Sequence, residues 1–274
     1  MLARAAADEE GARPWAVLKQ LSGNLPRIVP AKRHPCRHSD QRRLIGAGKM
    51  AAMFANSPTI VSAQSDIHEH LAARVTRHLA EPFRKPIGDV SRRALDEALA
   101  RWRQAGDVPL ILDAGCGVGE STLRLATAFP DHFVIGVDQS EKRLGAGKDW
   151  WGDAPMPGNF CWARADLVDV WRLLQEYGVP VARHYVLYPN PWPKIGHLGR
   201  RWQGHAVFPA LAACGDYLEC RSNWKVYVDE FVTALGMLGR PSVTEPWQPE
   251  TAMTPFERKY AASGHGLWRC VAQR

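Results

Sequence analysis

The spacing of hydrophobic residues changes near residue 108 of the chain. Before that point, apolar side chains recur every three or four residues in two segments, which predicts helices over residues 65–79 and 86–106. Ser91 is placed to cap the second helix, and Gly106 is a residue type that commonly ends one. The stretch before residue 108 is therefore expected to be helical.

After residue 108, short apolar runs alternate with amphipathic segments. The apolar runs predict β-strands over residues 108–113, 132–138, 158–166, 182–190 and 215–223. The segments between and after them predict helices over residues 119–129, 166–178, 204–214 and 224–239. Strands that alternate with helices form a parallel sheet with helices on both faces, so we expect an α/β fold. In such folds, ligands bind at the carboxyl ends of the strands.

Three stretches of different character divide the chain. Residues 1–50 mix Ala, Arg, Pro and Gly with little periodicity, which predicts a disordered basic extension. Two alternatives remain for it: a basic arm that binds RNA, or sequence upstream of a true start at Met50 or Met53. Residues 51–107 are expected to form a helical segment, and residues 108–274 the α/β domain.

Composition narrows the class of protein. The formal net charge is +7, and the first 50 residues carry +6 of it, so overall charge does not point to a nucleic-acid partner for the α/β domain. No apolar run is long enough to span a membrane, and no signal peptide is recognisable. The six cysteines are scattered without a C-x-x-C pair, which argues against a metal site and a disulfide scaffold. We expect a cytoplasmic protein without a bound metal.

A glycine loop follows the first predicted strand, in "LDAGCGVGEST". Gly115, Gly117 and Gly119 let the backbone turn sharply and approach a ligand closely. Their spacing differs from the G-x-G-x-x-G loop of dinucleotide-binding proteins, and Asp113, two residues before the first glycine, would repel a pyrophosphate. The loop therefore favours a cationic or hydroxyl-rich ligand, with Cys116 as a small space-filling residue.

Two further acids end the next two strands. Asp138 is placed to accept hydrogen bonds from both hydroxyls of a ribose, and Asp166 from an adenine amino group. Together with the loop, these residues resemble the class I S-adenosylmethionine (SAM)-dependent methyltransferases. SAM is therefore the predicted cofactor, and an NAD-dependent dehydrogenase is the alternative.

The segment "YPNPWPK" follows the fourth predicted strand, where methyltransferases place residues that meet the acceptor. Its prolines fix backbone angles and would aim Asn190 and Trp192 at a pocket. Trp192 is a candidate for stacking on a base, with core packing as the alternative. No acid occurs between residues 177 and 215, whereas Lys194, Arg200 and Arg201 do. These cations favour a phosphate-bearing substrate, although a solvated loop would have the same composition.

The segment resembles the proline-rich P-D-P-W-x-K turn of the tRNA (guanine-N7)-methyltransferase family. Where that family has Thr-Asp-Trp after the next strand, this chain has Ser222-Asn223-Trp224. The family's T-x-F-E and G-H-G-x-W motifs occur here in "TPFERKYAASGHGLWRC". Their matching residues are Thr254, Phe256, Glu257, Gly264, His265, Gly266 and Trp268. The resemblance covers residues 108–274.

The resemblance implies a Rossmann-like domain with a seven-stranded, mostly parallel sheet, and a guanine in tRNA as the methyl acceptor. It places the cofactor acids at Asp113, Asp138 and Asp166. It places substrate contacts at Lys194, Asn223 and residues 254–257, and the active-site position at Asn190. The family's two acceptor-site aspartates are thus both asparagine here, and Glu257 is the remaining acid that could hold the acceptor base.

Guanine N7 has a free lone pair, so its methylation needs no general base and depends on alignment and electrostatics. Charge-assisted hydrogen bonds are about twice as strong as neutral ones, so the loss of two carboxylates changes the acceptor site substantially. Methyl transfer to tRNA guanine N7 is the leading hypothesis. The alternatives are a related enzyme that methylates another RNA base or a small molecule, and an inactive RNA-binding protein.

Overall fold

The computed structural model describes residues 56–81, 83–146, 151 and 155–274, so the predictions for residues 1–50 lie outside the described part. Its centre is a seven-stranded sheet in the order β3-β2-β1-β4-β5-β7-β6. The strands are β1 (Leu110–Ala114), β2 (Phe133–Asp138), β3 (Phe160–Arg164), β4 (Arg183–Leu187), β5 (Tyr217–Ser222), β6 (Glu245–Pro246) and β7 (Trp268–Gln273). The first five pair in parallel, and β7 pairs antiparallel with both β5 and β6. The predicted mostly parallel α/β fold is confirmed.

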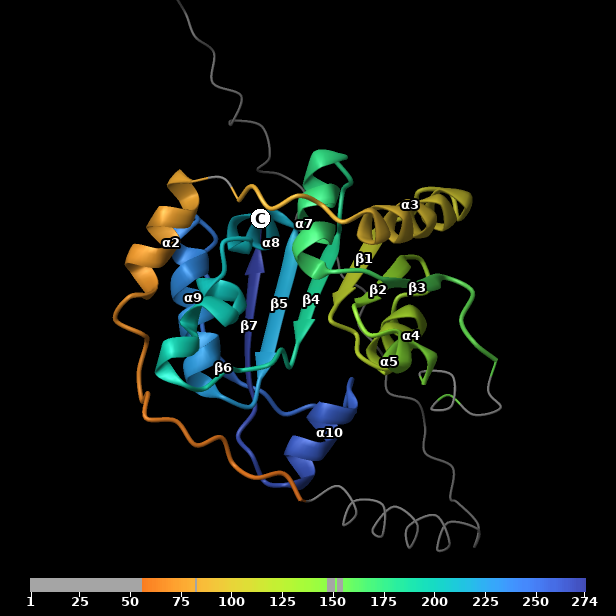
Figure 1. Cartoon of the computed structure of the whole chain (residues 1–274). Helices are drawn as coiled ribbons and strands as arrows, with labels where there is room; N and C mark the ends of the chain where they lie inside the picture. Colours follow the sequence, from red (N-terminus) through yellow and green to blue (C-terminus); the bar gives the residue numbers. More distant parts are fainter. Residues whose placement is uncertain (1–55, 82, 147–150, 152–154) are drawn as a thin grey trace, which may run out of the picture. The chain divides into compact units, whose positions relative to one another are not determined.

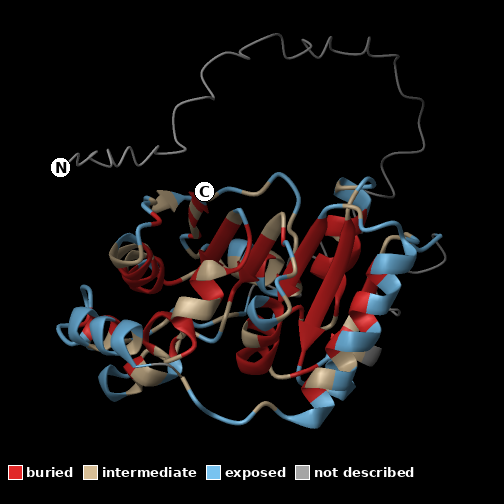
Figure 2. Cartoon of the chain, turned by 90° about the horizontal axis from the view of Figure 1, so that it is seen from above, coloured by how far each residue is buried: buried red, intermediate tan, exposed pale blue. Residues whose placement is uncertain are grey.

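Helices cover the sheet on both faces. They are α2 (Leu71–Ala80), α3 (Asp89–Gln104), α4 (Glu120–Ala128), α5 (Glu141–Gly145), α7 (Leu167–Glu176), α8 (Phe208–Ala213), α9 (Lys225–Met237) and α10 (Pro255–Ala262), with 3-10 helices at Ile195–Arg200 and Trp202–Gly204. One apolar cluster joins the strands to α2, α3, α7, α8 and α9, and a second joins them to α4 and residues near α10. The strands are buried and the outer faces of the helices are exposed (Figure 2).

The strand order indicates which end of the sheet binds ligands. From β1, the chain moves outward through β2 and β3, and then returns to the other side of β1 with β4 and β5. In open α/β sheets, a reversal of strand order such as the one between β1 and β4 marks the crevice at the carboxyl ends of the strands where ligands bind. The glycine loop follows β1 and the proline turn follows β4, so the topology brings these two segments to the same crevice. Helix α10 lies beyond the ends of β4 and β5 (Figure 1).

Two helix starts differ from the sequence predictions. Helix α2 begins at Leu71 rather than at residue 65, because residues before it bond to another element: the backbone N–H of His68 donates to the Glu230 carboxylate of α9 at 3.1 Å. Ser91 does not cap α3, which begins at Asp89 after Gly88. Its hydroxyl instead accepts a hydrogen bond from the backbone N–H of Asp166 at 3.2 Å, linking α3 to the end of β3.

Candidate active site

The carboxylate of Asp113 fastens the glycine loop to the helix that follows it. Its Oδ2 accepts hydrogen bonds from the hydroxyls of Ser121 and Thr122 of α4, at 2.6 and 2.7 Å. The side chain is buried, and this burial raises its pKa to about 6, while the two hydroxyl bonds act in the opposite direction. An acid held this way sets the shape of the loop and supplies negative potential behind it.

The glycine loop itself has the backbone that a close ligand approach needs. Gly115, Gly117 and Gly119 have φ angles of 81°, 60° and 85°, which other residue types adopt only with strain. A side chain at Gly117 would meet no atom within 4 Å, whereas one at Gly119 would come within 2.4 Å of the Trp162 indole nitrogen. Gly119 is therefore needed for packing, and Gly117 borders open space. Burial raises the pKa of the Cys116 thiol, which fits a space-filling role.

Asp138 lies at the end of β2 and faces the same loop. Its carboxylate accepts hydrogen bonds from the backbone N–H of Gly117 at 3.1 Å and of Ser140 at 2.8 Å. The guanidinium of Arg143, whose side chain is half-exposed, is 2.9 Å from Oδ1. Ribose hydroxyls that bind Asp138 would displace Arg143, whose side chain is half-exposed, rather than a buried partner. The geometry therefore fits the predicted ribose contact.

Asp166 caps helix α7. Its Oδ1 accepts from the backbone N–H of Val168 at 3.0 Å, and its Oδ2 is 3.4 Å from the Lys85 ammonium. The side chain is partly exposed, so the outer oxygen can still meet a ligand if Lys85 moves. The predicted contact with an adenine amino group stays a prediction, and the cap is a role that the sequence pattern did not reveal.

The proline turn after β4 is held in a strained backbone conformation. Tyr188 and Trp192 have φ angles of 52° and 46°, which cost of order 1 kcal/mol or more each for residues other than glycine. Asn190 is exposed at the tip, where its Oδ1 accepts from the backbone N–H of Trp192 at 3.3 Å. The Trp192 ring lies against Arg200, whose guanidinium carbon is 4.8 Å from the ring centre, and against His197.

Arg201 braces this turn from beneath, which corrects the prediction that it binds phosphate. Its side chain is completely buried and forms an ion pair with Glu230 at 2.7 Å. It also donates to the carbonyl oxygens of Trp192 and Lys194, at 3.2 and 3.3 Å. Its exposed neighbour Arg200 remains available to a substrate. Two adjacent arginines have opposite environments because a 3-10 helix ends between them.

Glu257 is also buried, and protein groups occupy both of its oxygens. Its Oε1 accepts from the Tyr188 hydroxyl at 2.8 Å, the Arg221 guanidinium at 3.0 Å and the Trp247 indole at 2.8 Å. Its Oε2 accepts from the backbone N–H of Met253 at 2.6 Å. In this structure Glu257 therefore ties α10 to the end of β4, rather than facing an acceptor base as predicted.

Thr254 and Asn223 lie close to this junction. Thr254 caps α10, since its hydroxyl accepts from the backbone N–H of Glu257 at 2.9 Å. Asn223 follows β5 and is half-exposed, with its amide Nδ2 3.0 Å from Nδ1 of His265. Lys194 is exposed at the start of the 3-10 helix. Asn190, Lys194 and Asn223 thus keep accessible positions, whereas Thr254 and Glu257 are buried.

The structure adds a segment that sequence reasoning missed. Residues 56–64 reach both sides of the acceptor region: Ser62 donates its hydroxyl to the Pro193 carbonyl at 2.6 Å, and the Ser57 carbonyl lies 3.0 Å from Nε2 of His265. Gln64 bonds to both Arg201 and Glu230. No periodic pattern marks this segment, so only its contacts reveal its part in the site.

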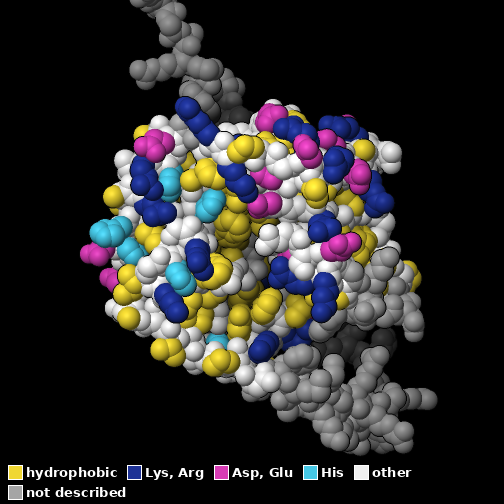
Figure 3. Space-filling view, in the orientation of Figure 1, with side chains coloured by type: hydrophobic (Ala, Val, Ile, Leu, Met, Phe, Trp, Pro, Cys, Tyr) yellow, Lys and Arg dark blue, Asp and Glu magenta, His cyan; other side chains and the backbone are white. Residues whose placement is uncertain are grey.

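The surface around the site is mixed in character. In the orientation of Figure 1, a hollowed band of hydrophobic side chains is bordered by Lys and Arg side chains, with some His and acidic side chains among them (Figure 3). Ile195 and Phe256 are exposed to 49% and 50%, at the proline turn and at α10 respectively. Exposed apolar groups beside exposed cations are what a nucleic acid with stacked bases and phosphates would contact.

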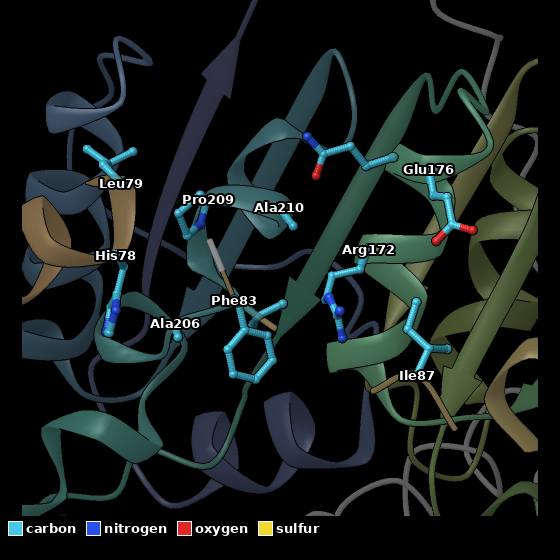
Figure 4. A pocket seen from close by; sticks show the side chains of 11 residues that line it. His78, Leu79, Phe83, Ile87, Arg172, Glu176, Ala206, Pro209 and Ala210 are labelled. Atoms are coloured by element: carbon cyan, nitrogen blue, oxygen red, sulfur yellow. The ribbon is translucent and has the colours of Figure 1, made fainter. Parts of the chain in front are cut away.

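A separate groove of about 420 Å³ lies between α2, α7 and α8 (Figure 4). Its lining includes His78 of α2, Arg172 of α7 and Phe83 from the segment before α3, and none of its lining residues was predicted as a site residue. Within the described ranges, no group of His, Cys, Asp and Glu side chains is arranged to hold a metal ion. None of the described helices combines the length and apolar character required to cross a bilayer.

Known proteins are similar to this chain in sequence. Residues 107–270 match a protein-family model described as "Putative methyltransferase". A tRNA (guanine-N(7)-)-methyltransferase of Bordetella pertussis is 29% identical over 232 residues, which cover 80% of this chain and 88% of that protein. One of Burkholderia ambifaria is 29% identical over 215 residues, which cover 67% of this chain and 79% of that protein.

The fold of this chain is also similar to that of solved structures. A 16S rRNA (adenine(1408)-N(1))-methyltransferase variant with the cosubstrate SAM, from Catenulisporales acidiphilia, is 19% identical to this chain. The match covers 64% of this chain and 90% of that chain, with a TM-score of 0.46.

Proposed function

The chain belongs to the tRNA (guanine-N7)-methyltransferase family, and from this premise we propose that it transfers a methyl group from SAM to N7 of a guanine in tRNA. It is an enzyme of the methyltransferase class with SAM as its cofactor. RNA is the substrate class that the relatives' names indicate, and tRNA is the member of that class that we propose.

The observation that carries the proposal is the pairing of two segments at the crevice between β1 and β4. The glycine loop after β1 offers open space at Gly117, with Asp138 beside it. The strained turn after β4 presents Asn190 and the half-exposed ring of Trp192 at the same end of the sheet. One segment would hold the methyl donor, and the other would align the acceptor with it.

The cofactor supplies an activated methyl group on a positively charged sulfur. On the protein side, the backbone at Gly115 and Gly117 would approach it, Asp138 would accept from the ribose hydroxyls and Asp166 from the adenine. The carboxyl groups near the loop favour a cation over an anion. This charge arrangement supports a sulfonium ligand over a pyrophosphate-containing one.

The acceptor needs placement more than it needs activation. Guanine N7 attacks with its own lone pair, so no side chain has to remove a proton before methyl transfer. Positive charge develops on the purine as the reaction proceeds, and side-chain carbonyl oxygens can stabilise it. Asn190 and Asn223 would supply such oxygens, while Trp192 would stack on the base and Lys194 and Arg200 would contact phosphates.

The decisive experiment is nucleoside mass spectrometry of tRNA incubated with the full chain and SAM. We expect 7-methylguanosine in unmodified tRNA transcripts, and none in transcripts that contain 7-deazaguanosine, because the nucleophilic N7 is replaced by C–H. The Asp138→Ala variant, which is expected to bind SAM weakly, serves as the low-activity control at a SAM concentration below its Kd. If SAM binds but 7-methylguanosine does not form in any tRNA, the acceptor assignment is wrong. Location in the cytoplasm stays a prediction.

The two acceptor-site asparagines favour a second candidate, a methyltransferase for another RNA base or a small molecule. Asparagine is both donor and acceptor, so it is less selective for the donor edge of guanine than aspartate is. The double variant Asn190→Asp/Asn223→Asp discriminates between the candidates. If 7-methylguanosine forms only after both substitutions, the natural acceptor is a different molecule.

A further inference from the structure

Asn223 is linked through His265 to the backbone of Ser57. The Asn223 amide Nδ2 is 3.0 Å from Nδ1 of His265, and Nε2 of the same ring is 3.0 Å from the Ser57 carbonyl oxygen. The His265 ring is stacked on Tyr260 of α10, with centres 5.4 Å apart and planes inclined by 12°. The three residues come from three distant parts of the chain, and all meet at the carboxyl end of β5.

The chemistry of the partners fixes where the protons lie. A backbone carbonyl only accepts hydrogen bonds, so Nε2 of His265 must carry a proton. In a neutral imidazole the other nitrogen, Nδ1, is then an acceptor, and only a donor can face it. The NH2 group of Asn223 is that donor. The amide oxygen of Asn223 therefore points away from His265, and it accepts no hydrogen bond from the residues that the structure describes.

We propose that His265 is a positioning residue, which holds the Asn223 amide with its oxygen directed at the acceptor base. The inference rests on the proposed function in that the base is a guanine, whose N1–H and 2-amino groups are donors. The Asn223 oxygen would accept from one of them. The 56–64 segment takes part in recognition, because the Ser57 carbonyl selects the tautomer of His265 that makes this orientation the stable one.

The inference also explains how the site works with an amide where an acid was expected. An aspartate at position 223 would need a donor at Nδ1, and His265 could supply one only as an imidazolium, since its other proton is used by Ser57. Asparagine makes the same contact with a neutral ring. Asn223 and His265 thus form an uncharged pair in this structure.

Among the described residues, few other side chains contact the His265 ring. Tyr260 of α10 is the titratable side chain in contact with it, and burial raises the pKa of that hydroxyl, so it stays neutral at pH 7. From the β5 side, the ring meets the neutral Asn223 amide, and from the N-terminal side the Ser57 carbonyl. No interaction found in the described part of the chain brings a charged side chain onto the His265 ring.

The first test is ¹⁵N NMR of the free protein with labelled histidine, with the His265 signals assigned by their absence in His265→Asn. We expect a bare Nδ1 and a protonated Nε2 at pH 7. In Asn223→Asp, we expect His265 to become an imidazolium that keeps its second proton to a higher pH than in the wild type. A protonated Nδ1 in the wild type, or identical titration in both proteins, would overturn the inference. The result does not depend on tRNA methylation.

The second test separates positioning from folding. His265→Ala removes the acceptor for the Asn223 amide, and we expect the KM for tRNA to rise about fivefold with a nearly unchanged kcat, since one neutral hydrogen bond to the base is lost. His265→Asn places an amide oxygen near the Nδ1 position and is expected to restore most of that loss. Equal KM values in the wild type and both variants would reject the inference and leave the proposed function standing. Absence of methylation in all three proteins, with the expected tautomer, would reject the function alone.

Discussion

The cofactor and acceptor sides of the crevice use their carboxylates differently. On the cofactor side, the buried carboxylate of Asp138 accepts a hydrogen bond from the glycine loop, and its cationic partner Arg143 is half-exposed. On the acceptor side, Glu230 and Glu257 are fully buried and bonded to arginines, and the accessible groups are the amides of Asn190 and Asn223. The carboxylate beside the proposed cationic ligand thus has a half-exposed arginine as its partner, whereas the carboxylates beside the proposed neutral base are paired with buried arginines.

The strongest test of this comparison is to remove the buried Arg201–Glu230 ion pair on the acceptor side. Arg201→Ala leaves the Glu230 carboxylate buried without its cation, and the loss of one partner of a buried pair typically costs about 3–5 kcal/mol. We expect the free energy of unfolding to fall by that amount in urea denaturation. Arg200→Ala, one residue away and exposed, is the matched control and should unfold as the wild type does. Equal stability of both variants would contradict the assignment of Arg201 as a brace.

On the cofactor side, the buried Asp113 predicts a pH dependence. Its pKa is raised from 3.8 to about 6 in the folded protein, so the folded state holds a proton that the unfolded state has lost in that window. The free energy of unfolding should therefore fall by about 2 kcal/mol as the pH rises from 4 to 7, relative to the Asp113→Asn variant. Urea denaturation of both proteins across this range measures it. A difference that is constant with pH would show that folding does not raise the pKa of Asp113.

Ligand binding to the cofactor side is expected to depend on Asp138. Asp138→Ala removes the acceptor for two ribose hydroxyls and should weaken SAM binding by roughly 100-fold, as expected for the loss of charge-assisted hydrogen bonds. Isothermal titration calorimetry with SAM or S-adenosylhomocysteine measures this change. Asp131→Ala, an exposed acid just before β2, should bind normally. Unchanged affinity in Asp138→Ala would refute the ribose contact.

The smallest expected effect concerns the exposed cation of the acceptor side. Arg200→Ala should weaken tRNA binding modestly and lower the slope of log affinity against log salt concentration by about one, as expected for one phosphate contact. Arg103→Ala on the exposed part of α3 is the control and should leave the slope unchanged. If both variants have the wild-type slope, Arg200 binds no phosphate and serves only to hold the Trp192 ring.

Much of the fold followed from local patterns. The five parallel strands lie where apolar runs predicted them, and α4, α7, α8 and α9 fall within the predicted helical segments. The antiparallel strands β6 and β7 were not found by pattern, because β6 has only two residues and β7 mixes exposed and buried positions. Their presence was implied only by the family resemblance. Helix α10 was likewise missed as an element, although its residues were recognised as a motif.

For the site, the sequence located the segments better than it located the side chains. It identified the glycine loop, the strand-end acids and the proline turn, since residue type and spacing carry that information. It did not distinguish the exposed Arg200 from the buried Arg201. The two are the same residue type at adjacent positions of a turn, and the sequence does not show which side chain points inward. It also assigned Glu257 to the substrate, because its burial depends on partners such as Tyr188 and Arg221, which lie far away in the chain.

The sequence by itself determined that this chain forms a mostly parallel sheet with a methyltransferase's loop and acids at its strand ends, since backbone conformation and hydrophobic periodicity are local properties. The tertiary structure alone decided which charges remain accessible. It buried Arg201 and Glu257 in the scaffold and brought Ser57, His265 and Asn223 into one hydrogen-bonded chain. The physical reason is that solvation and hydrogen-bond direction depend on partners contributed by distant segments, and no local pattern specifies them.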